Sequence, residues 1–270
     1  MKVKKRYVEK FAGITSEEYK ELGDRHRKVL EIFFEYKFNR ILDIGCGDGK
    51  FTVLIGKACK AKEVWGVDIS ERGIGMARKK GIKTFRVDVD EESLPFENNY
   101  FDAIYAGAII EHLFDPDHFL DEIYRVLKPE GILVLDTPNL ASLYNRLALL
   151  LGYQPFDMHV SIKYPIGHIY DGLYKQESGV TDTIRGSDHI RLFTYKSLLQ
   201  ILKNHNFNVV KVYGASDVIH SDSLVSSLVK AIDYVIRYLP SFSRNVVIIA
   251  QKNGNYQNRL KNKRIFKNKQ

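Results

Sequence analysis

The chain has 270 residues and a hydrophobic content of 44%, which is enough to bury the core of one α/β domain with an insertion. Its two cysteines, Cys46 and Cys59, are too few for a disulfide framework and lack the paired spacing of a zinc site. No window approaches eighteen uncharged apolar residues, and the basic N-terminal segment is not followed by an apolar segment. These features exclude a disulfide-rich or membrane-spanning protein, and we expect a soluble cytoplasmic one.

The formal net charge of +8 is concentrated at the two ends of the chain. Residues 252–270 hold seven bases and no acid, and residues 1–10 hold five bases and Glu9, so subtracting +7 and +4 from +8 leaves −3 for the rest. Charged ends of this kind are usually solvated and poorly ordered. We expect a disordered basic tail at 252–270 and no nucleic-acid partner, while contact of the tails with RNA or acidic lipid stays open as an alternative.

The hydrophobic pattern predicts alternating helices and strands. A helix over 16–37, opened by Ser16, belongs to an N-terminal arm at 1–38. Between residues 39 and 138 the predicted elements are strand 40–44, helix 50–60, strand 63–67, helix 71–79, strand 83–87, strand 101–105, helix 116–127 and strand 131–136. Strands separated by helices indicate βαβ units and a parallel sheet, whose ligand crevice lies at the carboxyl ends of the strands.

The alternation stops at 139–188, a long insertion with one predicted helix at 140–151. Its length and aromatic content favour a lid over an acceptor pocket, although most of its large side chains are expected to be packing residues. The residues that could form an aromatic wall are Tyr144, Arg146, Tyr153, Phe156, Tyr164, Tyr170 and Tyr174. We expect this insertion to determine which acceptor is bound.

The C-terminal part of the same domain, residues 189–251, returns to regular structure. Its predicted elements are helix 195–205 capped by Thr194, strand 207–213, helix 222–239 and strand 245–251. Leu224, Leu228, Ile232, Val235 and Leu239 form an apolar stripe on helix 222–239. We expect this stripe to face the core, with contact to a membrane surface as the alternative.

The stretch ILDIGCGDGK, residues 41–50, places glycines at alternate positions directly after a buried strand. Gly45, Gly47 and Gly49 have no Cβ, so a ligand can approach the backbone closely. The spacing differs from the G-x-G-x-x-G of dinucleotide sites, and Asp43 would repel a diphosphate but attract an ammonium or sulfonium group. A nicotinamide-dependent dehydrogenase is therefore the weakest of the alternatives.

Acidic residues follow the next two predicted strands. Asp68 can accept both ribose hydroxyls of an adenosine, and Asp88 can accept the adenine amine while Val89 covers the ring. An acid at a strand end is often only a helix cap, so each is weak evidence by itself. Together with Asp43, they place three acids at the ends of three successive parallel strands and favour a nucleoside site.

These motifs resemble the class I S-adenosylmethionine-dependent methyltransferases, particularly the small-molecule type that includes the ubiquinone-biosynthesis O-methyltransferases. The resemblance covers about 25–140 closely and 187–251 more loosely, on LDIGCGDG (42–49), GVDIS (66–70), VDVDEESLPFENNYFDAI (87–104), EHL (111–113) and RVLKPEGILVLDTPN (125–139). It implies a Rossmann-like, doubly wound α/β fold with a mostly parallel seven-stranded sheet, an antiparallel last strand and a lid insertion after strand 5. The sequence departs from the family pattern at Glu130 and Asn206, where glycines are usual, although asparagine also tolerates the left-handed conformation.

The resemblance also implies a binding site for S-adenosyl-L-methionine, which leaves as S-adenosyl-L-homocysteine. The residues it assigns to the methionine part are Asp43, Gly45, Cys46, Gly47, Gly49, Ala106 and Gly107. The residues it assigns to the nucleoside are Asp68, Ile69, Asp88 and Val89. The fourth strand ends in YAGA, without the Asn/Asp-Pro-Pro-aromatic tetrad of nitrogen methyltransferases, so we do not expect methylation of DNA or glutamine.

Methyl transfer to a hydroxyl also requires a group that removes the hydroxyl proton. His189 matches a histidine that small-molecule members often carry beside the acceptor, and structural capping is an equal alternative. His112 follows as a second candidate base with loop support as the alternative, and His159 and His168 in the insertion are weaker candidates. No metal-ligand spacing links these histidines along the sequence, so we expect no catalytic metal.

The sequence therefore predicts an enzyme that transfers a methyl group to a small-molecule acceptor. A hydroxyl oxygen of a glycan, a quinone or an isoprenoid-linked precursor is the favoured acceptor. Two alternatives remain: an RNA or protein methyltransferase that uses the basic tails, and a cofactor-binding module without catalytic activity. The sequence does not decide the oligomeric state.

Overall fold

The computed structural model describes residues 19, 21–158, 160–161, 166–168, 189–216 and 224–254, and leaves out the side chains of 224–228. Several predictions made from the sequence lie outside these residues. They are the helix opening at Ser16, the basic segments at 1–10 and 255–270, His159, and the insertion tyrosines Tyr164, Tyr170 and Tyr174.

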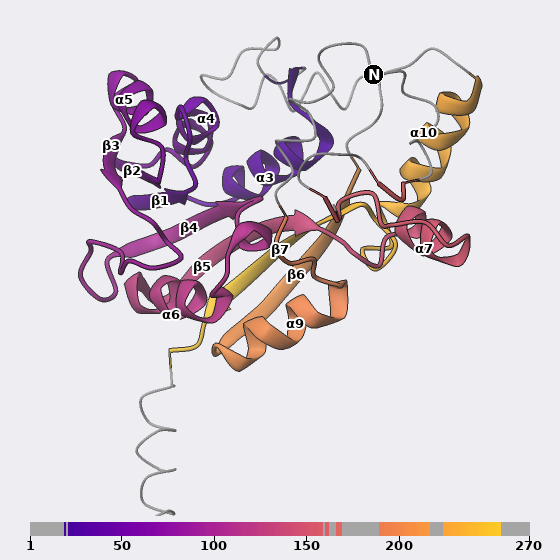
Figure 1. Ribbon diagram of the computed structural model, residues 1–270. Helices are drawn as coiled ribbons and strands as arrows, with labels where there is room; N and C mark the ends of the chain where they lie inside the picture. Colours follow the sequence, from indigo (N-terminus) through magenta and orange to yellow (C-terminus); the bar gives the residue numbers. More distant parts are fainter. Residues whose placement is uncertain are drawn as a thin grey trace, which may run out of the picture.

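A seven-stranded sheet forms the centre of the molecule (Figure 1), with the strand order β3-β2-β1-β4-β5-β7-β6. The strands are β1 (Arg40–Ile44), β2 (Glu63–Asp68), β3 (Lys83–Arg86), β4 (Phe101–Gly107), β5 (Leu127–Pro138), β6 (Phe207–Ala215) and β7 (Asn245–Lys252). Strands β1 to β5 pair in parallel, and β7 is antiparallel to both of its neighbours, β5 and β6. The prediction of a mostly parallel sheet with an antiparallel last strand is confirmed.

Helices cover both faces of this sheet (Figure 1). On one face lie α3 (Asp24–Phe34), α4 (Lys50–Cys59) and α5 (Glu71–Lys79), and on the other lie α6 (Pro116–Val126) and α9 (Tyr195–Asn204). Two further helices, α7 (Leu143–Leu150) and α10 (Leu224–Ile236), lie together at one end, and a single 3-10 turn, η1 (Ile110–His112), follows β4.

The alternation of side chains along each strand explains the two helical layers. In β4, Phe101 and Ile104 pack in the core under α6 and α9, whereas Ala103 and Tyr105 pack in the core under α3 and α4. Successive side chains of a strand point to opposite faces, so a strand that is apolar at every position must be covered on both sides. The sheet is therefore buried along its middle, and its strand ends are left for a ligand.

Of two helix predictions, one differs from the structure at its N-terminal end and the other is confirmed there. The helix expected over 16–37 is interrupted, because α3 begins at Asp24 after Gly23, whose extended backbone (φ −63°, ψ 164°) forms its N-cap. The helix at 195–205 is present, and Thr194 caps it in a reciprocal pair with Ser197. Both family departures occupy left-handed backbone, with φ 64° at Glu130 and 65° at Asn206.

Lys252 was assigned to the basic tail, and this assignment is wrong. Its side chain is buried at the end of β7, and its Nζ donates to Asn99 Oδ1 (2.7 Å) and to the carbonyl oxygens of Tyr124 and Leu127 (both 2.6 Å). Burial lowers the pKa of Lys252 to about 8, because the charged form loses its hydration. The folded domain therefore extends at least to this residue.

Candidate active site

A cavity of about 430 Å³ opens at the carboxyl ends of the parallel strands. Its walls come from the ends of the first four strands and the segments that follow them. The lining residues are Gly45, Val67, Asp68, Ile69, Val87, Asp88, Val89, Asp90, Gly107, Ala108, Ile109, His112 and Leu113. The crevice predicted from the topology is present, and it is flanked by carboxylates and apolar side chains.

The glycine turn after β1 borders this cavity at Gly45. The backbone N–H groups of Gly45 and Cys46 both donate to the carbonyl of Val67, at 2.8 and 3.1 Å, which ties the turn to β2. Gly45, Gly47 and Gly49 all have positive φ, between 51° and 78°. A Cβ on Gly45 would lie 3.0 Å from Ile109 Cδ1, so a side chain here would narrow the cavity.

Asp68 and Asp88 both line the cavity, and their role in a nucleoside site remains a prediction. The Asp68 carboxylate accepts the backbone N–H groups of Gly47 and Ser70, each at 2.8 Å, which fixes its orientation. Asp88 accepts the N–H of Asp90 at 3.1 Å. Ser70, and not Asp68, caps helix α5, so the simple helix-cap interpretation of Asp68 does not hold.

Asp43 lies behind the glycine turn and does not line the cavity. Its side chain is 4% exposed and accepts a hydrogen bond from Thr52 Oγ1 at 2.5 Å. Burial raises the pKa of Asp43 to about 7, with the Thr52 bond opposing and the charge of Asp68 adding to the rise. Its expected contact with the cationic methionine part of a cofactor remains a prediction.

A second buried carboxylate, Asp136, lies at the end of β5. It accepts the hydroxyl of Tyr105 at 2.7 Å and pairs with Arg25 of α3 at 3.0 Å. A Cβ on Gly107 would lie only 2.0 Å from the Tyr105 hydroxyl, so glycine is required there by packing as well as by the cavity. Ala106, which was expected to line the methionine wall, is fully buried in the core instead.

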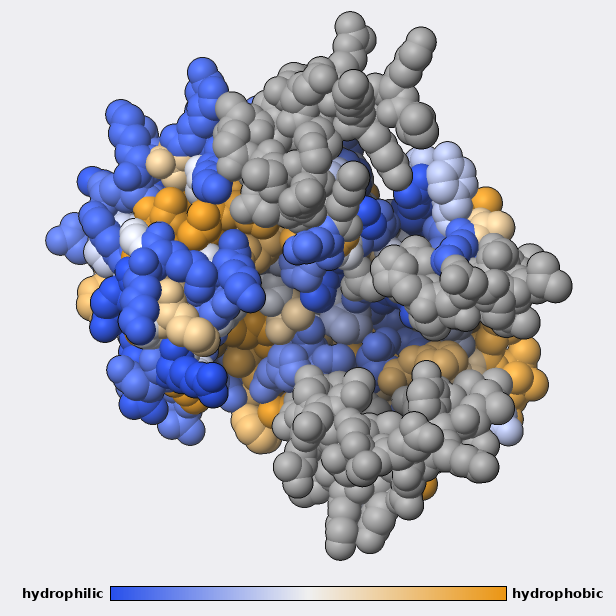
Figure 2. Space-filling model, turned by 90° about the horizontal axis from the view of Figure 1, so that it is seen from above, coloured by the Kyte–Doolittle hydropathy of each residue, from blue (hydrophilic) through white to orange (hydrophobic). Residues whose placement is uncertain are grey.

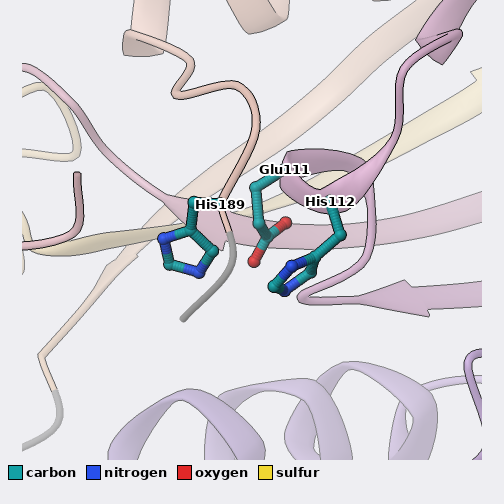
Figure 3. A group of neighbouring side chains, drawn as sticks. All are labelled: Glu111, His112 and His189. Carbon is teal, nitrogen blue, oxygen red and sulfur yellow. The ribbon is translucent and has the colours of Figure 1, made fainter. Parts of the chain in front are cut away.

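Two of the four candidate histidines meet beside the cavity (Figure 3). The side chains of Glu111, His112 and His189 converge. One atom of each that could bind a metal ion, a ring nitrogen or a carboxylate oxygen, lies within 4.8 Å of the other two. His112 lines the cavity, and its ring centroid is 4.9 Å from that of His189. His168, by contrast, is buried elsewhere in the insertion segment and does not line the cavity.

Hydrogen bonds fix the chemistry of this trio. His189 Nδ1 is 2.7 Å from the carbonyl oxygen of Asp157. A carbonyl can only accept, so Nδ1 carries the hydrogen and Nε2 of the neutral ring presents a lone pair. Glu111 is fully buried; one of its oxygens accepts from Thr137 Oγ1 at 2.8 Å, and the other has no hydrogen-bond partner among the described residues.

Two imidazoles and a carboxylate are also a possible ligand set for a divalent metal. The spacing of these residues along the sequence could not reveal this ligand set, because His189 and His112 are far apart in sequence and come together only in the folded chain. The expectation of no catalytic metal therefore remains a prediction.

Arg191, near His189 in sequence, donates to the carbonyls of Leu113 and Phe114 at 3.2 and 2.7 Å and so holds the loop after η1.

Sequence reasoning missed several contributors to the site. Glu111 was recognised only as part of a motif, and Asp90, Ile109 and Leu113 were not identified as lining residues. Asp90 accepts the N–H groups of Phe114 and Asp115 at 2.8 and 2.7 Å. These bonds join the segment after β3 to the segment after η1. No local pattern marks such a contact, because its partners follow a different strand. Cys46, Gly47 and Gly49 shape the turn without lining the cavity.

Comparisons with known proteins agree with this geometry. The profile of the family described as "Methyltransferase domain" matches residues 14–212. A probable S-adenosylmethionine-dependent methyltransferase of Mycobacterium tuberculosis is 33% identical over 99 residues, which is 37% of this chain and 35% of that protein. The ubiquinone/menaquinone biosynthesis C-methyltransferase UbiE of Burkholderia vietnamiensis is 37% identical over 103 residues, which is 36% of this chain and 42% of that protein.

The match spans only about a third to two fifths of the length of these curated relatives. In three dimensions the similarity is broader. The crystal structure of an S-adenosylmethionine-dependent methyltransferase from Archaeoglobus fulgidus aligns with a TM-score of 0.53 and 22% identity, over 92% of this chain and 98% of that one. This likeness concerns the fold alone. With the family profile covering well over half of its length, the chain belongs to the class I S-adenosylmethionine-dependent methyltransferases, whose cofactor is S-adenosylmethionine.

Proposed function

We propose that the protein transfers a methyl group from S-adenosylmethionine to a hydroxyl oxygen of a small-molecule acceptor. The observation that carries the proposal is the position of the Glu111–His112–His189 trio beside a cavity lined by Asp68 and Asp88. When bound, the cofactor supplies an electrophilic methyl group on a sulfonium. The residues of the chain must then bind the cofactor, hold the acceptor in line and remove a proton.

The cofactor end of the cavity suits an adenosine. The Asp68 carboxylate is held by two backbone N–H groups and keeps lone pairs for the ribose hydroxyls. Val87, Val89 and Leu113 offer apolar surfaces for the adenine ring, and Asp88 offers an acceptor for its amine. The methionine part would then extend toward Gly45 and Gly107, where no side chain obstructs it.

The end of the site at the Glu111–His112–His189 trio, which we call the acceptor end, provides the base that removes the proton. With the cofactor bound, the lone pair on His189 Nε2 would take the hydroxyl proton as the acceptor oxygen gained the methyl group, and S-adenosylhomocysteine would leave. The ring becomes a cation, and the buried carboxylate of Glu111 stabilises it. His112, which lines the cavity, positions the acceptor between His189 and the cofactor.

Carbon methylation of a hydroxylated ring is the second candidate, and it is favoured by the name of the UbiE relative, a C-methyltransferase of quinone biosynthesis. The same trio would serve it, because removal of a ring hydroxyl proton makes the neighbouring carbon nucleophilic. Incubation with labelled S-adenosylmethionine and reduced quinone analogues, followed by mass spectrometry, tests both candidates. The position of the added methyl separates oxygen from carbon transfer. Absence of any methylated product across hydroxylated acceptors would refute the proposal.

A further inference from the structure

The helices α7 and α10 bury polar side chains and expose apolar ones. Helix α7 buries Asn145 and leaves Leu150 80% exposed, and α10 buries Asp233 and leaves Val235 60% exposed. The apolar stripe of α10 was expected to face the core, and for Val235 and Leu239 that prediction is wrong. An ordinary surface helix has the opposite arrangement.

Hydrogen bonds on the inner side hold this arrangement in place. Tyr144 of α7 donates to Asp233 of α10 at 2.8 Å, and Asn145 Oδ1 accepts the N–H of Phe156 at 2.8 Å. One oxygen of Asp233 and the side-chain oxygen of Asn145 are therefore paired on the inner side, and rotating either helix to turn its exposed leucines and valine inward would break these bonds. The outward direction of the apolar side chains is therefore fixed by the polar contacts beneath them.

We call the exposed apolar side chains of the two helices, together with those of the residues that directly follow each helix, the α7–α10 face. Its members are Leu147, Leu149, Leu150, Leu151, Tyr153, Tyr234, Val235, Tyr238 and Leu239. Apolar surface appears at the right of Figure 2, the side on which Figure 1 places α7 and α10. Apolar patches of this kind on a soluble domain mark interaction sites, because exposure to water is unfavourable in proportion to area.

The charges around this face identify its partner. The bases in described segments 139–158 and 229–251 are Arg146, Lys230, Arg237 and Arg244. The acids in the same segments are Asp157 and the buried Asp233. Arg237 lies over the rings of Tyr234 and Tyr238, at 4.1 and 5.3 Å from their centroids, so cations and tyrosines are interleaved with leucines.

This pattern fits the surface of an anionic bilayer. Leucines enter the boundary of the acyl chains, tyrosines lie at the headgroup level, and arginines pair with anionic headgroups. A contact with a second copy would bring the same excess of basic residues to both sides of the interface, which is unfavourable. No helix among the described residues is long and apolar enough to cross a membrane, so contact would be with the surface.

We propose that the α7–α10 face docks the protein on anionic membranes and that the acceptor is an amphiphilic molecule taken from the bilayer. The face adjoins the acceptor end of the site, because Asp157, which follows α7, contacts His189. The nature of the acceptor rests on the proposed function, whereas docking does not. Vesicle binding without methyl transfer would therefore refute the proposed function alone.

The test is sedimentation of the full chain with vesicles of phosphatidylglycerol and phosphatidylcholine, or of phosphatidylcholine alone. We expect binding to the anionic vesicles that weakens as salt is raised. Leu150→Ser and Val235→Ser should each lower the partition coefficient about tenfold, and Arg237→Gln about fivefold on anionic vesicles only. Val210→Ser, which alters a valine 52% exposed on β6, is the matched control and should change nothing.

Calorimetric binding of S-adenosylmethionine by each variant shows that the folded site is retained. No sedimentation of the folded parent with anionic vesicles would overturn the docking proposal, and so would equal losses in Val210→Ser and Leu150→Ser. Light scattering adds a further arm. A dimer that Leu150→Ser dissociates, together with no vesicle binding, would assign the face to a second copy of the chain and overturn the proposal.

Discussion

The cofactor half of the molecule and the α7–α10 half arrange polar and apolar groups in opposite ways. At the strand ends, Asp68 and Asp88 line a cavity together with apolar side chains, and the strands themselves are buried in the apolar core. On α7 and α10, Asn145 and Asp233 are buried and leucines face outward. The difference fits the two proposals, in which one half would hold a charged nucleoside and the other would present an apolar surface beside the acceptor end of the site.

The largest expected effect would test the acceptor half. His189→Gln should lower kcat by about 10²–10⁴ because it removes the proton acceptor, while affinity for S-adenosylmethionine stays at the parent value. Single-turnover assays and calorimetry measure the two separately. His118→Gln is the control, since His118 lies outside the trio and its ring Nε2 lies 3.3 Å from the carbonyl oxygen of Glu92.

Treatment with a metal chelator also tests whether His189 acts as a base. Turnover of the parent enzyme should be unchanged, because the proposal uses His189 Nε2 as a base and not as a ligand. If turnover were lost and then restored by a divalent cation, Glu111, His112 and His189 would be metal ligands instead.

The second prediction concerns cofactor binding in the cavity at the strand ends. Gly45→Val should weaken S-adenosylmethionine binding by at least about 100-fold, because a branched side chain at φ 78° is strained and its Cβ would lie 3.0 Å from Ile109 in the cavity. Gly81→Val is the matched control, since φ there is 84° but nothing lies within 4 Å of the added Cβ. Titration calorimetry that found equal affinities in the two variants would place the cofactor elsewhere.

The strand periodicity explains why this half could be predicted from the sequence. Apolar runs separated by helices fix a parallel sheet, and the ends of its strands must meet at one edge. The meeting of His112 with His189, and of Glu111 with both, depends on chain segments far apart in sequence. The outward face of α10 was also unpredictable, because its apolar stripe is compatible with either side until the bond between Tyr144 and Asp233 fixes the rotation.

A smaller effect is expected at Asp68. Asp68→Asn should weaken cofactor affinity about 10- to 100-fold, because charge-assisted hydrogen bonds to the ribose contribute about 1.5–3 kcal/mol. Asp48→Asn is the control: it removes a charge from the same glycine turn, but Asp48 pairs with Lys80 at 3.5 Å and does not line the cavity. Equal losses in both variants would indicate a general charge effect and count against a ribose contact.

The titration of Asp43 gives a fourth prediction, in which apo stability and cofactor affinity change with pH in opposite directions. Its folded pKa of about 7 lies above the ordinary value, so the folded apo protein holds this proton more tightly than the unfolded chain does. The contribution of Asp43 to apo stability is full below about pH 4 and is lost as pH rises to about 7. A cationic cofactor prefers the ionised form, so its affinity should instead rise, by up to about tenfold per pH unit below 7.

Urea unfolding and calorimetry between pH 5 and 8 measure these two trends. Asp43→Asn should remove the rise in affinity and the Asp43 share of the stability trend, because the amide does not titrate in this range; Asp136, whose pKa burial also raises, keeps its own share. A parent affinity that stayed flat while the apo stability changed would mean that Asp43 titrates but does not contact the cofactor.

The smallest effect is expected far from either half, at the turn where Glu130 replaces the glycine usual in the family. Its φ of 64° strains a residue with a side chain, so Glu130→Gly removes about 1–2 kcal/mol of strain from the folded state. The same change adds freedom to the unfolded chain, worth about 0.4–1 kcal/mol in the opposite direction. The net gain in unfolding free energy should be below about 1.5 kcal/mol, with cofactor affinity unchanged. Asn206→Gly should stabilise less, because asparagine already tolerates left-handed backbone; a larger gain at Asn206 by urea unfolding would contradict this ranking.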